Sequence, residues 1–341
     1  MVDIEFHYWM TGIIAERAGF SQDEAAVIAY ASEYVDENDV SIAVVWPGGR
    51  RAPYRNFVSQ TMNILRPRRE LMRVYPIFHF MPGDPEAESA RRRDGHLHIL
   101  NTTPDSENAR TLFDRAFSAP EHVRLYRIGI ATHMYADTWA HQNFVGWFDS
   151  FNHLDMALMP DIGHADALRH PDWPAHRWED NRLVESAVDN RMRFLDAAEA
   201  IFKRYCRYLK TQGRPDHSRR WARLKQELAM AMGPGFSGDE NWYREGRLQG
   251  YKSLVPWLPE FDERDWFNAA IVTRVRGLRD PGEGLAALFT LFPDSYTFRE
   301  DVDHEQTHWF RFQEAVKEHE RTALDLLEPL FGQMAVDIRK S

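Results

Sequence analysis

Apolar positions recur at helical spacing along most of this chain. Ser21, with Glu24 three residues later, and Asp105-Ser106 both stand before such stretches and have the form of helix N-caps. The stretches are 21–37, 54–73, 105–118, 121–145, 182–211, 217–232 and 303–330. Gly- and Pro-rich breakers separate them, and no comparable run alternates with a period of two. The pattern predicts an all-α fold, a compact arrangement of many helices.

Residues 147–181 interrupt this pattern, because they are rich in His, Asp, Trp and Pro and show no sustained periodicity. Loops longer than about 12–15 residues inside a compact domain tend to be functional or disordered. The aromatic residues of this segment argue against disorder. We therefore predict a long structured loop.

Composition agrees with a globular protein. Of the 341 residues, 43% are hydrophobic, 13% are aromatic and 28% are charged. The net charge of −10 disfavours a broad nucleic-acid surface, which would need many Lys and Arg contacts to phosphates. Cys206 is the only cysteine, so an intrachain disulfide and a Cys-rich zinc site are both excluded. Any metal must be held by His, Asp, Glu or backbone groups.

The first twenty residues lack the apolar core of a signal peptide and contain Asp3, Glu5 and Glu16. No later stretch reaches the roughly 18 uninterrupted apolar residues of a spanning helix. We therefore expect no transmembrane segment and a cytoplasmic location by default, with export by a route without a cleaved signal left open. The sequence does not indicate an oligomeric state.

The segment ATHMYADTWAHQNFVG is the strongest candidate for chemistry. His133, Asp137 and His141 stand at i, i+4 and i+8, which places them on one stripe of a helix. Neighbours such as Ile130 and Trp139 are apolar, so the helix is expected to be buried, and unpaired polar side chains there would be costly. The alternative is a set of core histidines bonded to carbonyls, with one buried ion pair. We favour coordination of a metal cation.

Further His and carboxylate residues stand in aromatic or small-residue surroundings. They are His7 in EFHYW, Asp36 in ASEYVDEND, His79 in IFHFMPG, and His164 with Asp166 in IGHADA. Each alone fits a cap, a turn or a solvated position equally well. Together they supply nitrogen and oxygen ligands for two or three zinc-like ions, with other divalent metals as an alternative.

These motifs resemble the zinc-dependent phospholipase C and P1-type nuclease superfamily. Its members are all-helical and combine His-x-x-x-Asp on a central helix with a second His, a later Gly-His, an early His, an Asp and a His-Phe turn. The resemblance implies that His133 and Asp137 form the central pair, with Asp137 bridging two ions. It also implies that the other ligands are His141 and His164 for one ion, then Asp36 and His79, and the early His7. The same strings resemble, more closely, an uncharacterised family of bacterial and fungal proteins, well over residues 1–180 and weakly beyond.

The chain departs from the superfamily in three ways. Superfamily enzymes use the amino group of a processed N-terminal residue as a ligand, whereas this chain begins MVDIEF, so that ion is missing or is held by Asp3 or Glu5. The acid expected four residues after the Gly-His is replaced by Leu168. The candidates to take its place are Asp166, Asp161 and Asp172. The His after the central pair also stands at a different spacing.

Two other patterns offer alternatives. His304-Glu305-x-x-His308 matches the helical zinc-peptidase motif, although a third ligand would have to come from Glu318, His319 or Glu320. The basic run Arg91, Arg92 and Arg93 suits contacts to a substrate phosphate, or else a solvated surface.

The sequence thus predicts a zinc-dependent hydrolase of a phosphate ester, with a phosphodiester of phospholipid or nucleotide type preferred. A metal-activated water would attack phosphorus, and Asp36 and Asp137 would be the catalytic carboxylates. The alternatives are a non-catalytic, metal-stabilised binding protein and a zinc peptidase. Residues 1–232 are expected to form a helical metal-binding core, with 233–341 as a helical extension packed on it in one structural unit.

Overall fold

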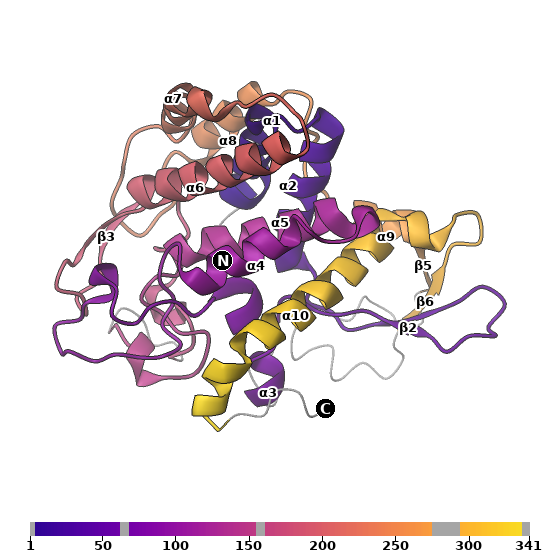
Figure 1. Cartoon of the computed structure of the whole chain (residues 1–341), viewed down its shortest axis with the longest axis horizontal. Coiled ribbons are helices and arrows are strands. Elements are labelled where there is room, and N and C mark those ends of the chain that lie inside the picture. The colour runs from indigo at the N-terminus through magenta and orange to yellow at the C-terminus, as the bar shows by residue number, and fades with distance from the viewer. Residues whose placement is uncertain (1–3, 62–67, 155–160, 275–293, 336–341) are drawn as a thin grey trace.

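The structure is a computed structural model that describes residues 4–61, 68–154, 161–274 and 294–335 (Figure 1). Its main helices are α1 (Thr11–Ala18), α2 (Gln22–Glu37), α3 (Arg68–Leu71), α4 (Glu107–Ala116), α5 (Glu121–Ala140), α6 (Asn190–Thr211), α7 (Trp221–Ala231), α8 (Arg244–Leu254), α9 (Asp265–Ala270) and α10 (His308–Gln333). Two short π-helices are η1 (Glu5–Met10) and η2 (Tyr75–His79). Short 3₁₀ turns are η3 (Glu88–Ala90), η4 (Ser150–Asn152), η5 (Ala165–Ala167), η6 (Ser218–Arg220) and η8 (His304–Gln306). The fold is therefore broadly helical, as expected.

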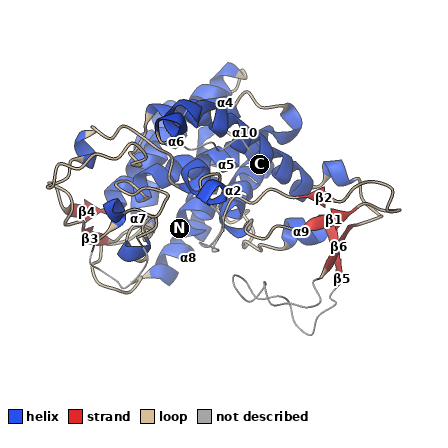
Figure 2. Cartoon of the chain, turned by 90° about the horizontal axis from the view of Figure 1, so that it is seen from below, coloured by secondary structure: helices blue, strands red, loops and turns tan. Residues whose placement is uncertain are grey.

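Short strands accompany the helices, although the sequence predicts none. A four-stranded sheet has the order β2 (Tyr54–Arg55), β1 (Ala43–Val45), β6 (Ser295–Phe298), β5 (Ile271–Arg274), with β1 parallel to β6 and the other pairs antiparallel. A second, antiparallel pair joins β3 (Arg177–Glu179) to β4 (Ala187–Asp189). The two sheets lie at opposite ends of the molecule in Figure 2. Strands of two to four residues are too short to produce an alternating pattern.

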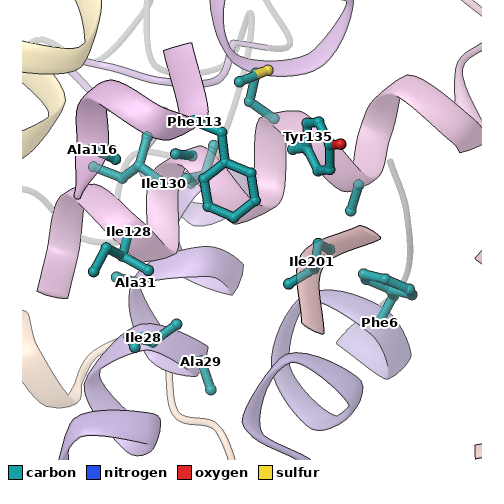
Figure 3. Packing of buried hydrophobic residues seen from close by; sticks show 14 of the residues in the cluster. Phe6, Ile28, Ala29, Ala31, Phe113, Ala116, Ile128, Ile130, Tyr135 and Ile201 are labelled. Carbon is teal, nitrogen blue, oxygen red and sulfur yellow. The ribbon is translucent and has the colours of Figure 1, made fainter. Parts of the chain in front are cut away.

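Helix α5 occupies the centre of the molecule and contacts α2, α4, α6 and α10 (Figure 1). Every residue from Tyr126 to Ala140 is buried. Ile128 and Ile130 of α5 belong to the same core as Ile28 of α2 and Phe113 of α4 (Figure 3). A helix that is apolar on all sides is expected in such a position. Any polar side chain that it carries must find its partners inside the protein.

Helices α2 and α5 approach each other closely at Gly129. A Cβ atom added there would lie 2.6 Å from both the Cβ of Ala31 and the carbonyl oxygen of Ile28, where real contacts are 3.4–4 Å. A residue without a side chain is therefore required at this crossing. The approach brings the ends of α2 and α5 that carry Asp36 and Asp137 side by side.

Local signals in the sequence located several helix ends correctly. Ser21 caps α2 in a capping box with Glu24, and Ser106 caps α4 by accepting a hydrogen bond from the amide of Ala109. Other ends differ, since α5 stops at Ala140 rather than at residue 145, and α6 begins only at Asn190, where Asp189 caps it.

The helix predicted over 54–73 is wrong for most of its described part. Residues 54–55 pair with β1, and the amide of Phe57 donates to the side chain of Gln313 from α10. Residues 62–67 lie outside the described part, and only Arg68–Leu71 is helical. Pairing with the nearby strand β1 and a hydrogen bond to the distant Gln313 replace the helical hydrogen bonds of this segment.

The segment 147–181 is a loop with short turns, as predicted, except for strand β3 near its end, which the sequence does not predict; residues 155–160 lie outside the description. None of the described helices combines the length and apolarity needed to cross a membrane.

Candidate metal centre

Eight buried or nearly buried His and Asp side chains gather against α5. Helix α5 and its C-cap provide His133, Asp137 and His141, which form the stripe predicted from their spacing. The other five come from separate elements: His7 from η1, Asp36 from the last turn of α2, His79 from η2, and His164 and Asp172 from the loop after residue 147. Both π-helices carry one of these histidines, and π-helical turns are frequent at functional sites.

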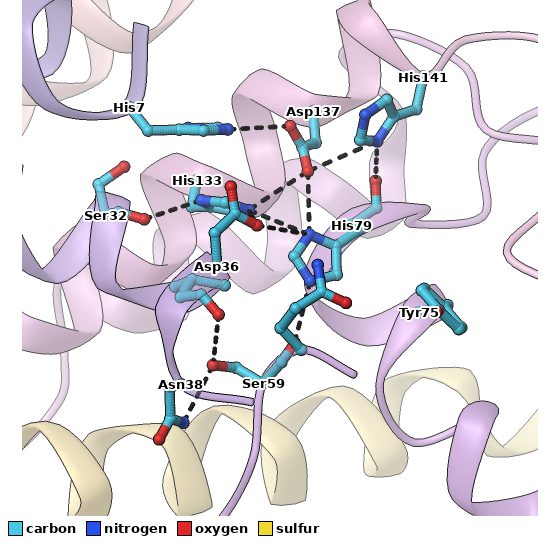
Figure 4. Close-up of polar contacts among 12 residues, drawn as sticks. His7, Ser32, Asp36, Asn38, Ser59, Tyr75, His79, His133, Asp137 and His141 are labelled. Carbon is cyan, nitrogen blue, oxygen red and sulfur yellow. Dashed lines mark hydrogen bonds and ion pairs between the residues drawn. The ribbon is translucent and has the colours of Figure 1, made fainter. Parts of the chain in front are cut away.

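Four of these side chains form the A cluster: Asp36, His79, His133 and Asp137 (Figure 4). His133 Nε2 lies 3.1 Å from His79 Nδ1, and both nitrogens lie 3.3 Å from Asp137 Oδ2. Asp36 Oδ1 lies 3.6 Å from His133 Nε2 and 3.7 Å from His79 Nδ1. Four donor atoms therefore converge on one point.

Backbone carbonyls fix which nitrogen of each ring faces this point. His133 donates from Nδ1 to the carbonyl of Ser32 at 2.8 Å, and His79 donates from Nε2 to the carbonyl of Ser59 at 2.9 Å. In each neutral ring the other nitrogen then carries a lone pair. The two lone pairs face each other and two carboxylate oxygens, an arrangement that suits a cation.

The separations in the A cluster match a tetrahedral ion. The five distances between donor atoms given above span 3.1–3.7 Å. Zinc bound to nitrogen and oxygen at about 2.0–2.1 Å in a tetrahedron would place its ligands roughly 3.3–3.4 Å apart. The two imidazoles and two carboxylates therefore fit a zinc ion.

His141, His164 and Asp172 form a second group, the B cluster. His141 Nε2 and His164 Nε2 lie 3.5 and 3.6 Å from the same oxygen, Asp172 Oδ1. Backbone carbonyls again fix the orientation of both imidazole rings. His141 donates from Nδ1 to the carbonyl of His79, and His164 donates from Nδ1 to the carbonyl of Leu168, both at 2.9 Å. Three donors thus face one point, the number that catalytic zinc sites take from the protein.

His7 adds a third group with His133 and Asp137. Its Nε2 lies 3.2 Å from Asp137 Oδ1, and its ring stacks on that of His133 with the ring centres 3.7 Å apart. The fully buried Nδ1 of His7 has no hydrogen-bond partner among the described residues. Asp137 consequently faces the A cluster through one oxygen and His7 through the other, as a bridging carboxylate would.

The pKa shifts of Asp137, His79 and His164 suit a cation, whereas Asp137 and Asp172 raise the pKa of His141 despite its burial. Burial opposes ionisation of Asp137, but His141, His133 and His7 hold its pKa well below the usual value. Burial lowers the pKa of His79, and it lowers the pKa of His164 to about 3. Ionised carboxylates beside neutral imidazoles are the forms that bind metal. In the described part of the chain, the ion pairs of Asp137 are all with histidines, so no Lys or Arg neutralises it.

A family model described as "Family of unknown function (DUF6765)" matches residues 2–327. The chain belongs to this family. No curated protein and no solved structure matches the chain. The resemblance to the zinc-dependent phospholipase C and P1-type nuclease superfamily therefore remains an expectation from the motifs.

Asp166 does not join the site predicted for it. Its Oδ2 accepts a hydrogen bond from the amide of Leu154 at 2.6 Å, and it falls in a separate group with His153 and Asp161. Of the three acids left open by the sequence, Asp172 is the one that meets His141 and His164. Leu168, which stands at the position of the expected acid, instead contributes its backbone carbonyl.

Glu5 is also unable to serve as a substitute ligand. Its fully buried carboxylate receives two hydrogen bonds from Arg247, at 2.7 and 3.0 Å. The pair fixes η1, which carries His7, against α8. Asp3 lies outside the described residues.

The zinc-peptidase motif does not form a helical pair. His304 lies in η8 and points to the carbonyl of Arg299, whereas His308 starts α10 and bonds to the hydroxyl of Tyr126 at 2.7 Å. The described residues offer no third ligand near them.

The basic run is divided between different environments. Arg92 is buried and bonds to the carbonyl of Phe151 and to Asp94, and Arg93 bonds to the carbonyl of Leu183. Arg91 and Arg93 are both exposed, and of these two only the side chain of Arg93 is bonded to a carbonyl in the described part of the chain. Contact of Arg91 with a phosphate stays a prediction.

Proposed function

We propose that this protein is a metal-dependent hydrolase of a phosphate ester, with two or three zinc ions held by the A cluster, the B cluster and His7. The observation that carries the proposal is the position of Asp137. Its Oδ2 belongs to the A cluster and its Oδ1 faces His7, so one carboxylate can serve two adjacent ions. The ring of His141, whose Nε2 belongs to the B cluster, lies directly beside it. Adjacent ions that share a carboxylate are the usual apparatus for displacement at phosphorus.

Divalent ions bound there would lower the pKa of a water molecule and neutralise charge on the phosphate oxygens. The protein's own residues do the rest. Asp36 is the most exposed carboxylate of the A cluster, at 8%, and its position suits accepting a proton from the attacking water. The A cluster offers four protein donors and the B cluster three, so the B cluster is the better place for a substrate oxygen.

A phosphodiester is the preferred substrate class. The support for it is the motif resemblance together with a centre whose donor groups could hold more than one ion. The exposed Arg91 is the candidate for contact with a second phosphate substituent. Phospholipids and nucleotide-like diesters both carry the required group.

The test measures bound metal and hydrolysis together. Purified protein should contain two to three zinc ions per chain and should hydrolyse bis(p-nitrophenyl) phosphate faster than p-nitrophenyl phosphate. Removal of the metal with a chelator should abolish both properties, and zinc should restore them. The variants His133→Ala and Asp137→Asn should lose metal and reduce turnover by at least about 100-fold, since each removes a ligand of more than one group.

His96→Ala is the matched control, because His96 has a side chain that is 77% exposed and lies outside the centre. Glu305→Gln tests the peptidase alternative and should leave turnover unchanged. Stoichiometric metal without turnover of any diester, monoester or phospholipid would overturn the hydrolase and leave a metal-stabilised binding protein. Activity that survives Asp137→Asn but is lost in Glu305→Gln would establish the peptidase.

A further inference from the structure

A buried pair of amide side chains lies behind the A cluster. Gln313 of α10 is fully buried and donates from Nε2 to Asn38 Oδ1 at 2.8 Å, while its Oε1 accepts from the amide of Phe57 at 3.2 Å. Asn38, the C-cap of α2, donates from Nδ2 to the carbonyl of Phe57 and to Ser59 Oγ. The two side chains therefore clamp residues 57–59 against the end of α2.

The clamped segment contacts both sides of the A cluster (Figure 4). The carbonyl of Ser59 accepts the hydrogen bond that sets the ring of His79, and the amide of Ser59 donates to the carbonyl of Asn38 at 3.0 Å. The hydroxyl of Ser59 donates to the carbonyl of Val35, the residue before Asp36. One short segment thus fixes the neighbours of two candidate ligands, His79 and Asp36.

A different amide stands behind the B cluster. Asn190, the first residue of α6, is fully buried and donates from Nδ2 to three carbonyls, those of His170, Pro171 and Trp173, at 2.6, 3.2 and 2.9 Å. Its Oδ1 accepts from the indole of Trp178. The three carbonyls lie on both sides of Asp172 in the sequence, so Asn190 determines the path of the chain through that ligand.

We infer that these amides are positioning residues, with Gln313 and Asn38 serving the A cluster and Asn190 serving the B cluster. The inference rests on the proposed function only in assuming that the clusters hold ions. Amides suit this role because they offer donors and acceptors together and carry no charge. They can hold carbonyls and loops beside the centre without repelling a cation or competing for it. Buried hydrogen-bonded networks of this kind fix one arrangement of the groups that they connect.

The two amide sets make no contact with each other, so each can be tested against the other. Gln313→Met should weaken binding of the A-cluster ion by about 10-fold, the lower end of the effect of losing a direct partner of a ligand, because Gln313 acts through Asn38 and residues 57–59, and it should leave the B cluster unchanged. Asn190→Leu should do the reverse. Each variant is thereby the control for the other at similar burial, although Gln313→Met removes two side-chain hydrogen bonds and Asn190→Leu removes four.

The measurement is the occupancy of each ion position, from anomalous scattering of crystals equilibrated at graded zinc concentrations. Titration with a chromophoric zinc chelator gives the two affinities in solution. Stability is measured separately in chelator, where a merely structural effect would appear. Excess zinc should restore full occupancy in both variants, because the ligands themselves remain.

Equal weakening of both positions by each variant, or no change in either, would overturn the inference. A wild-type protein that binds no zinc would instead overturn the proposed function, so the two failures are distinguishable. Should a variant not fold, Gln313→Ala or Asn190→Ala takes its place. Each removes the hydrogen bonds of the amide without adding a charge or a larger side chain, and the same criterion applies.

Discussion

Substitution of Gly129 by alanine should damage the centre from a distance. The added Cβ would lie 2.6 Å from the carbonyl oxygen of Ile28, and ordinary contact begins at 3.4 Å, so α2 and α5 must separate by about 0.8 Å at this point. One turn further along both helices, His133 Nδ1 donates to the carbonyl of Ser32 at 2.8 Å. The same separation would stretch this bond to about 3.6 Å, beyond hydrogen-bonding distance.

The cost of Gly129→Ala follows from three contributions. Overpacking costs about 1–3 kcal/mol, and the lost hydrogen bond costs about 1 kcal/mol. The higher helix propensity of alanine returns about 1 kcal/mol. The net loss of stability is therefore about 1–3 kcal/mol, and zinc affinity should fall about 10- to 100-fold because the ring of His133 is no longer held.

Guanidinium unfolding in the presence of chelator measures the first quantity, and competition with a zinc chelator measures the second. Gly332→Ala is the matched control, since Gly332 lies in α10 and nothing stands within 4 Å of its added Cβ. That variant should be more stable by about 0.5–1 kcal/mol and should bind zinc normally. Wild-type stability and zinc affinity in Gly129→Ala would refute the reasoning.

Three further predictions concern other parts of the molecule. Leu168 has φ +52°, a backbone conformation that strains any residue with a side chain. Leu168→Gly should therefore raise the unfolding free energy, measured in chelator, by about 1 kcal/mol, and a lower unfolding free energy would show that the backbone at Leu168 is not strained. Burial and Arg127 hold the pKa of His319 well below 6.5; the unfolded chain therefore binds the extra proton below pH 6.5, and stability should fall there by up to about 1.4 kcal/mol per pH unit. Urea unfolding measured from pH 7.5 to 5 should show that the unfolding free energy of His319→Gln falls less steeply with decreasing pH than that of the wild type. Equal slopes in the two proteins would exclude His319 as the source of the pH dependence. Arg247→Met should cost about 3–5 kcal/mol by leaving Glu5 buried and ionised, whereas adding Glu5→Gln should recover part of the loss; additive effects in the double-mutant cycle would argue against the pair.

The parts of the centre that were predictable from sequence depend on local geometry. The stripe of His133, Asp137 and His141 follows from helical periodicity, and the cap at Ser21 follows from its own side chain and that of Glu24. Such features need no knowledge of the rest of the fold. They account for the central helix and for the histidines at its surface.

The other parts depend on contacts between distant segments. Asp166 and Asp172 are equally plausible partners for His164 by spacing, and only the turn at η5, which directs Asp166 to the amide of Leu154, separates them. Residues 54–61 have apolar residues at helical spacing, yet Gln313, more than 250 residues away, takes the amide of Phe57. Periodicity carries no information about either contact.

The orientation of the candidate ligands in the centre cannot be inferred from their residue types. Each of His79, His133, His141 and His164 is oriented by a backbone carbonyl, and any residue can supply a carbonyl, so no residue type in the sequence marks them. The carbonyl of His79 even orients His141, which links the A cluster to the B cluster through the main chain of η2. Most of the candidate ligands can therefore be read from the sequence, with Asp172 left undecided, whereas the direction of their side chains is a property of the packed backbone. It follows that substitutions which move α2, η2 or the loop around Leu168 should alter metal binding as strongly as substitutions of the ligands' immediate neighbours.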